Sequence, residues 1–263
     1  MNVPISPKNI TRVLALIVVG LSLASLAGQY YTHFLGDDTF WLRVAEKLDV
    51  NREDNSLPTW YQTVSLFSCF LLLAVIAAAA RAGADRYTRH WVILALVFLY
   101  LSADEFLVIH EQVDALLRSV FQTRGAFLYA WVIPGGVFVL LFAAAYARFL
   151  LDLPARTRFL FIVGGAVYVS GALGMEMISA YFVDSYGDGL AGEQTFTFAI
   201  LAAIEESLEM SGIVVFINGL LSHVTLHAGT AEITEPVVAS GLPTAAVEPA
   251  TVGRATQHLT ARS

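Results

Sequence analysis

Seven carboxyl side chains lie within or at the edge of long apolar stretches of this 263-residue sequence. A charge at the centre of a bilayer costs about 2.5–3.5 kcal/mol on insertion scales, so an acid in such a stretch needs a physical reason. No Lys or Arg lies inside these stretches to neutralise the acids. The acids occur with one histidine in three segments: LSADEFLVIHEQ holds Asp104, Glu105, His110 and Glu111, GALGMEMISA holds Glu176, and AIEESLEMSG holds Glu205, Glu206 and Glu209.

Carboxyls held close together in a low dielectric either take up protons or bind a cation. Carboxylates with one imidazole suit Mn, Fe, Zn or Mg, and helical bundles build metal centres from Glu and His on facing helices. The sequence therefore predicts a divalent-metal site with the candidate ligands Asp104, Glu105, His110, Glu111, Glu176, Glu205 and Glu209. The spacing matches the Glu-x-x-His pairs of dinuclear centres poorly. Two alternatives stay open: hydrogen bonds between helices by protonated acids, and a path for protons or cations.

The composition indicates that membrane-spanning helices hold these residues. The chain is 57% hydrophobic and 14% charged, whereas an ordinary soluble domain is about 25% charged. Apolar residues gather in six stretches long enough to cross a bilayer as helices, namely 13–31, 60–80, 91–110, 127–150, 159–183 and 196–221. We therefore expect an all-α, polytopic membrane helix bundle of about six transmembrane helices.

The distribution of basic residues predicts the orientation of this bundle. Ten Lys and Arg residues fall on the side of the N-terminus and five on the other side. Basic residues near helix ends resist translocation, so both termini are expected in the cytoplasm. Cleavage after Ala27, as in a signal peptide, would leave five helices in the same orientation.

We expect a transmembrane domain over residues 1–222 and a disordered cytoplasmic tail over 223–263, where small and polar residues follow no period. In the extracytoplasmic loop 36–58, residues 40–50 have helical spacing, which fits either an interfacial or a solvated helix. The Pro-Gly-Gly sequence at 134–136 predicts a kink or local unwinding in the fourth helix. Small residues in the fifth helix should let its neighbours approach closely: Gly164, Gly165, Gly171 and Gly174.

The acids of the three segments are expected to lie at a similar depth in the membrane. At 1.5 Å of rise per residue, Asp104, Glu176 and Glu205 lie roughly 8–15 Å below the outer ends of their helices. At about 100° of turn per residue, Asp104 and Glu111 share one face of their helix, as do Glu205 and Glu209. We expect these five acids to converge in the outer half of the membrane, joined from the flanks by Glu105 or His110.

Four motifs resemble a group of uncharacterised six-helix bacterial membrane proteins. They are PTW at 58–60, LSADE at 101–105 followed by HE at 110–111, GALGMEM at 171–177 and EESLEM at 205–210. The resemblance covers about residues 10–222 and leaves out the tail. It implies a six-helix architecture in the bacterial inner (cytoplasmic) membrane and points to the same acids, without supplying a reaction.

Composition and motifs narrow the function. The net charge is −7 with no block of Lys and Arg, which argues against a nucleic-acid partner. The single cysteine, Cys69, excludes an intrachain disulfide, and no phosphate-loop, nucleophile-elbow or zinc-helix motif occurs. Membrane lipid is the expected partner, with assembly as a homo-oligomer or within a membrane complex left open.

Three functions fit these observations, and whether the protein is an enzyme stays open. The first is a site for a metal or other cation that opens to the periplasmic side, in an enzyme acting on a lipid or isoprenoid-like substrate. The second is a small transporter coupled to protons or cations. The third is a non-catalytic subunit of a larger membrane complex. The inner half of the membrane lacks acids below Glu209, which favours an outward-facing pocket over a transport path.

Overall fold

The computed structural model describes residues 6–36, 39–49, 56–187 and 190–234. Within these ranges the chain is helical and forms no strand, which confirms the prediction of an all-α bundle. The helices are α1 Pro7–Phe34, α2 Thr39–Leu48, α3 Leu57–Ala82, α4 Thr88–Leu107, α5 Ile109–Phe121, α6 Val132–Asp152, α7 Ala155–Val169, α8 Glu176–Tyr186 and α9 Phe196–Thr234. Three short elements join them: the 3₁₀ turns η1 Gly125–Phe127 and η3 Ala191–Gln194, and the π-helical turn η2 Ser170–Met175.

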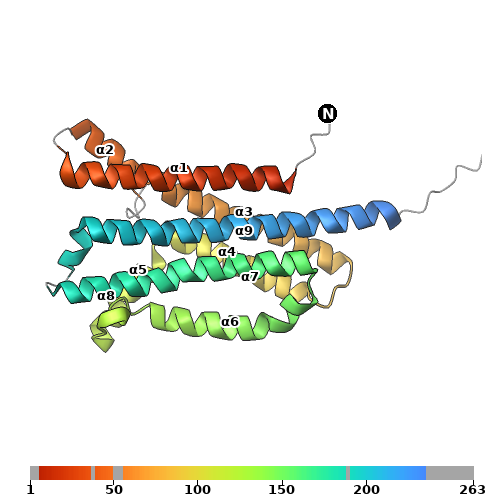
Figure 1. The fold of residues 1–263 in the computed structure, drawn as a ribbon. Helices are drawn as coiled ribbons and strands as arrows, with labels where there is room; N and C mark the ends of the chain where they lie inside the picture. Colours follow the sequence, from red (N-terminus) through yellow and green to blue (C-terminus); the bar gives the residue numbers. More distant parts are fainter. Residues whose placement is uncertain (1–5, 37–38, 50–55, 188–189, 235–263) are drawn as a thin grey trace, which may run out of the picture.

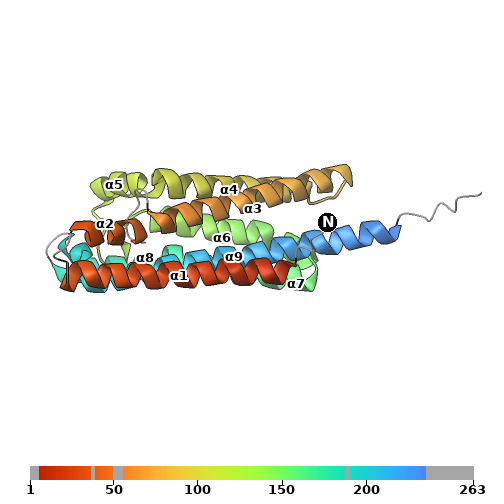
Figure 2. The ribbon, with the colours of Figure 1, turned by 90° about the horizontal axis from the view of Figure 1, so that it is seen from above.

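Five helices in the described part of the chain are long and apolar enough to cross a membrane. They are α1, α3, α4, α6 and the continuous helix 155–186, which joins α7, η2 and α8. The long helices lie side by side along one direction (Figures 1 and 2). The predicted stretch 196–221 falls within α9, which packs against α1, α3 and α7. Helix α9 is not among the five, so the count of six crossings stays a prediction.

Two apolar clusters form the core of the bundle. In the larger one, Leu66 and Cys69 of α3 pack with Trp91 of α4, Phe149 of α6 and Phe161 of α7. The smaller cluster joins α1 to α9 through residues such as Val18 and Met210. Since α9 contributes to both clusters, it connects the two parts of the core.

Helices α7 and α9 approach each other so closely that only glycine fits at the contact. A Cβ on Gly212 would lie 2.6 Å from the backbone nitrogen of Tyr168, and one on Gly171 would lie 2.8 Å from the backbone oxygen of Glu205. Gly164 faces the backbone of α9 in the same way, whereas Gly165 faces open space. The predicted close packing of the fifth helix therefore depends on Gly164 and Gly171.

The structure corrects two boundaries. Helix α6 begins at Val132, so Pro134 lies in its first turn. Backbone N–H groups in the first turn have no acceptor within the helix, so proline costs no hydrogen bond there. Neither a kink nor unwinding occurs at 134–136, because residues 127–131 are not α-helical and the helix starts after them. Helix α9 continues to Thr234, so the predicted tail starts too early. Val224 packs against the larger core cluster, which holds the helix past residue 222, and residues 235–263 lie outside the described part.

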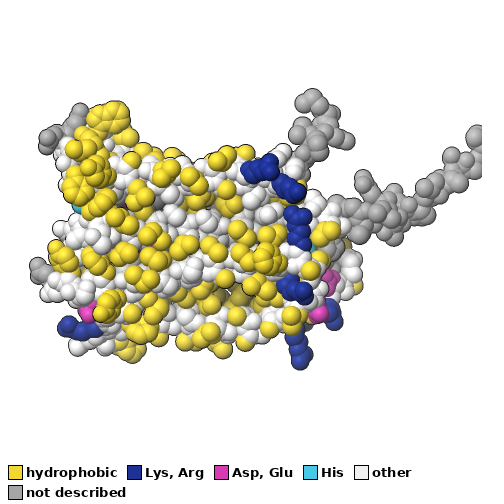
Figure 3. Space-filling view, viewed as in Figure 1, with side chains coloured by type: hydrophobic (Ala, Val, Ile, Leu, Met, Phe, Trp, Pro, Cys, Tyr) yellow, Lys and Arg dark blue, Asp and Glu magenta, His cyan; other side chains and the backbone are white. Residues whose placement is uncertain are grey.

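Lys and Arg side chains gather in a band near the end of the bundle where α1 begins, while apolar side chains cover most of the remaining face (Figure 3). We call this the basic end and the opposite one the far end. The helix ends and loops at the basic end hold Lys8, Arg12, Arg81, Arg86, Arg89, Arg148, Arg156 and Arg158. At the far end, α2 lies within the segment 36–58 and exposes Phe40 and Trp41.

Candidate functional site

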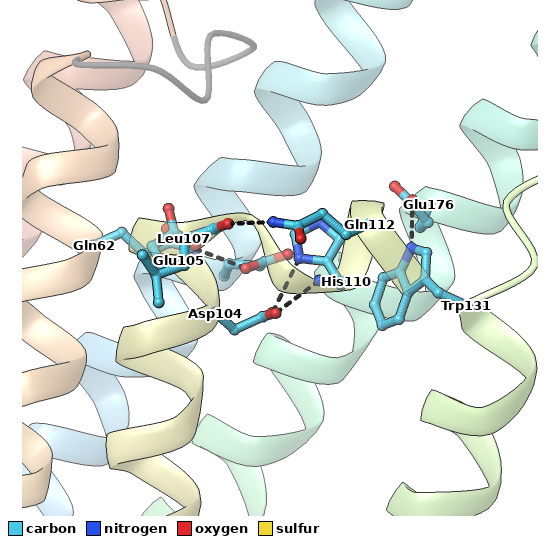
Figure 4. Close-up of polar contacts among 9 residues, drawn as sticks. Gln62, Asp104, Glu105, Leu107, His110, Gln112, Trp131 and Glu176 are labelled. Atoms are coloured by element: carbon cyan, nitrogen blue, oxygen red, sulfur yellow. Dashed lines mark hydrogen bonds and ion pairs between the residues drawn. The ribbon is translucent and has the colours of Figure 1, made fainter. Parts of the chain in front are cut away.

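A break between α4 and α5 brings the first two site residues together. Val108 has φ 53° and ψ 46°, a left-handed conformation that is strained for a β-branched residue. Asp104 stabilises the break, because its Oδ1 accepts the backbone N–H of His110 at 2.8 Å and its Oδ2 lies 3.0 Å from Nδ1 of the same histidine. The break therefore folds His110 back onto Asp104 (Figure 4).

The same break removes Glu111 from the cluster. The predicted shared face of Asp104 and Glu111 assumed one continuous helix, which the structure replaces with two helices at Val108. Glu111 is exposed in the first turn of α5. Its placement with the converging acids is therefore wrong.

A buried amide from α3 links two of the predicted acids. Gln62 is fully buried and donates through Nε2 to Glu105 Oε2 at 3.1 Å and to Glu209 Oε2 at 2.8 Å. Glu209 is itself 9% exposed. One side chain of α3 thus connects α4 to α9 in the interior of the bundle.

Glu176 and Glu205 form a second group at the far-end half of the bundle. The indole Nε1 of Trp131 donates to Glu176 Oε1 at 2.8 Å, and the carboxyl groups of Glu176 and Glu205 lie close to each other. The π-helical turn η2 ends directly before Glu176, and its extra residue per turn sets the direction of that side chain.

Asp114 fixes the loop that carries Trp131. This carboxylate is 4% exposed, accepts the backbone N–H groups of Ala130 and Trp131, and forms an ion pair of 2.8 Å with Arg118. The ring of Trp131 then lies 5.1 Å, between centroids, from the ring of His110. Asp114 thus acts on the cluster through Trp131.

The structure therefore brings the predicted residues together as three contacts: Asp104 with His110, Glu105 with Glu209 through Gln62, and Glu176 with Glu205. Glu206 is half-buried next to Glu205. No group of three or more His, Cys, Asp or Glu side chains in the described ranges is placed to hold one metal ion. Apart from Glu111, the predicted ligands are distributed over these three contacts.

Sequence reasoning missed Gln62, Asp114 and Trp131 as parts of the cluster. Gln62 did carry a signal, since a lone amide inside a membrane-spanning stretch needs a polar partner. Asp114 and Trp131 gave none, because their contacts depend on the turn between α5 and α6.

A largely apolar cavity of about 940 Å³ lies beside the cluster, between α4, α6, α7, η2 and α9. Phe138 and Phe142 of α6 and Val169 of α7 are among the residues of its wall. Asp104, His110 and Trp131 line it toward the far end, and Phe149 and Leu150 line it toward the basic end. The cavity thus joins a long apolar space to the Asp104–His110 pair.

Asp104 also controls the charge of His110, which lies in α5 outside the spanning helices. Burial by itself lowers the pKa of the imidazole, but the hydrogen bond and charge of Asp104, with the charges of Glu176 and Glu105, raise the pKa above its ordinary value of 6.5. The pair therefore favours protonated His110.

Asp104→Asn should lower the pKa of His110, because burial remains while the adjacent charge is removed. The pKa would be measured from the ¹⁵N shifts of the histidine ring, with His110→Gln to assign its signal. Because the pKa of His110 is higher in the folded protein than in the unfolded chain, its protonation stabilises the fold at pH values below the unfolded pKa. This stabilisation is lost as the pH rises through the folded pKa. The stability difference between wild type and Asp104→Asn should therefore shrink with rising pH. An unchanged or raised pKa in the variant would contradict the assignment.

One family comparison bears on the chain. A family model described as a domain of unknown function (DUF8692) matches residues 11–224. The match agrees with the resemblance to an uncharacterised family. No curated protein and no solved structure matches the chain.

Proposed function

The chain belongs to the DUF8692 family, and we propose that it binds a membrane amphiphile, with the apolar chain in the cavity and the polar head at Asp104 and His110. The observation that supports this proposal is that the polar pair and the apolar cavity are continuous, since Asp104 and His110 line the far end of the cavity. A volume of about 940 Å³ is near the upper end of the range of about 300–1,000 Å³ typical of small-molecule pockets.

The Asp104–His110 pair suits a polar head group chemically. With Nδ1 bound to Asp104, the imidazole is fixed in orientation and Nε2 is the ring nitrogen available to a ligand. Such a pair donates or accepts one proton at a defined point. The chemistry that this pair offers a ligand is therefore hydrogen bonding or proton transfer.

The cellular setting belongs to the same proposal. The band of Lys and Arg at the basic end supports a cytoplasmic location for that end. The Asp104–His110 pair then lies toward the opposite side, which is the periplasmic side in a bacterial inner membrane. The amphiphile would be bound from the outer half of the bilayer.

Gly165→Leu tests the binding of an amphiphile. Gly165 lines the cavity and an added Cβ meets nothing within 4 Å, so leucine should fill the space without distorting the helix. Native mass spectrometry of protein purified in mild detergent should show co-purified lipid on the wild type and about a tenfold lower occupancy on the variant.

Gly136→Leu is the matched control, because Gly136 also faces open space but does not line the cavity. Its lipid occupancy should equal that of the wild type. Equal occupancy in all three proteins, or none in the wild type, would contradict the proposal.

The closeness of the Glu176 and Glu205 carboxyl groups favours a second candidate, namely binding of a divalent cation between them. Two carboxyl ligands are few for Zn, Fe or Mn, whereas Mg²⁺ is commonly held by one or two carboxylates and water. This candidate is compatible with the first, because the pair contacts Trp131, a residue of the cavity wall.

Magnesium chloride should raise the melting temperature of the wild type at constant ionic strength if the pair binds Mg²⁺. Glu205→Gln should abolish this shift, since it removes one ligand charge. Glu111→Gln serves as control because Glu111 is exposed in α5, and it should keep the shift. The same shift in all three proteins would reject a site at the pair.

A further inference from the structure

We infer that the amphiphile is an isoprenoid lipid with one long chain and an uncharged, oxygen-bearing head. This inference rests on the proposed function and adds the class of ligand to it. Two properties of the cavity carry it: its length along α6 and the charge balance of its polar end.

The cavity is longer than one leaflet of a bilayer. Its wall includes Pro134 and Leu150 of α6, which at 1.5 Å of rise per residue lie about 24 Å apart along the helix. The hydrocarbon core of a bilayer is about 30 Å thick, so the chains of one leaflet fill about 15 Å of it. A phospholipid whose head lies at the far end would leave the basic-end half empty, whereas a long isoprenoid chain extends past the midplane.

The wall of the basic-end half suits such a chain. Phe142, Tyr146, Phe149 and Phe161 line this half, and Phe149 and Phe161 also belong to the larger core cluster. Buried aromatic rings present large, rigid apolar surfaces, which fit the methyl-branched, unsaturated units of an isoprenoid chain. Helix α6 lies at the edge of the bundle (Figure 1), so this wall is next to the surrounding lipid.

The charge at the polar end argues for an uncharged head. The described residues that line the cavity include no Lys or Arg. His110 is already paired with Asp104 at 3.0 Å, and Glu105 and Glu176 lie near enough for their charges to act on the same histidine. A phosphate head would therefore meet net negative charge, whereas a hydroxyl or carbonyl oxygen needs only one hydrogen-bonding partner.

Binding of solanesol and farnesol in detergent tests the chain length, with Ala143→Phe as a plug. Ala143 lines the cavity midway along α6, and the adjacent Ala144 does not. Solanesol should bind the wild type at least about tenfold more tightly than farnesol. Ala143→Phe should remove this advantage and leave farnesol binding unchanged, and Ala144→Phe should change neither. Equal binding of both alcohols, or the same loss in both Phe variants, would overturn the inference on length.

The head is tested with ligands that share the solanesyl chain. Solanesol and the ubiquinone with a solanesyl tail both carry uncharged head groups. Whichever of them binds more tightly shows whether the site prefers an alcohol or a quinone head. Solanesyl phosphate should bind at least about tenfold more weakly than that ligand, and equal or tighter binding would overturn the inference on charge.

Failure of the inference and failure of the proposed function are distinguishable. Phospholipid that binds the wild type, and is lost in Gly165→Leu, would keep the proposed function and overturn the isoprenoid class. Absence of every amphiphile from the wild type would overturn both.

Discussion

Gln62→Leu is expected to destabilise the protein by about 3 kcal/mol or more. The side chain is fully buried and donates to Glu105 at 3.1 Å and to Glu209 at 2.8 Å. A hydrogen bond typically contributes about 0.5–1.5 kcal/mol net, and a buried carboxyl left without its donor costs a further desolvation penalty of about 1–3 kcal/mol. Unfolding in mixed micelles, followed by circular dichroism, would measure the loss.

A double variant separates the polar network from simple packing. If the loss comes from a carboxyl left without its donor, Gln62→Leu combined with Glu209→Leu should be more stable than the sum of the single losses predicts. Gln112→Leu is the control, because Gln112 is exposed and its side chain donates to the backbone oxygen of Leu107. Additive losses in the double variant would show that Gln62 and Glu209 do not act as a unit.

Gly212→Ala is expected to produce the second large effect, although it adds a single methyl group. The new Cβ would lie 2.6 Å from the nitrogen of Tyr168 and 2.8 Å from the oxygen of Gly164. Both are backbone atoms, so α7 and α9 must move apart. Overpacking of this kind typically destabilises a protein by about 1–3 kcal/mol and occasionally more. The same unfolding assay applies.

The matched control is Gly165→Ala in α7. A Cβ at this position meets nothing within 4 Å, and alanine is favoured over glycine in a helix by about 1 kcal/mol. Gly165→Ala should therefore be neutral or slightly stabilising. If both variants have the same stability, the close contact between α7 and α9 is not required.

The apolar pattern predicts the all-α class but not the points where helices break. Val108 lies within the continuous apolar stretch 91–110 and has the residue type least expected in a left-handed conformation. The break is stabilised by contacts of Asp104 with His110, which follow only from the folded arrangement. The local sequence pattern therefore favours a continuous helix, whereas hydrogen bonds formed in the folded protein stabilise a break at Val108.

The candidate site is predictable where chemistry alone identifies its members. Glu105, Glu176, Glu205 and Glu209 stand out because carboxyls are rare in apolar stretches, and the structure gives each of them a polar partner. How they divide into separate pairs depends on Gln62, whose position opposite α9 follows from the packing of α3. The cavity has no signature in the sequence, because it results from the placement of α6 beside the other helices.

A cryo-electron microscopy structure of the protein in nanodiscs of native lipid would show whether the cavity between α4, α6 and α7 holds the chain of a membrane amphiphile. We expect continuous density along the cavity, with one end within hydrogen-bond distance of His110 Nε2. A structure in which α6 closes against α4 and α7, with no density between them, would contradict this expectation.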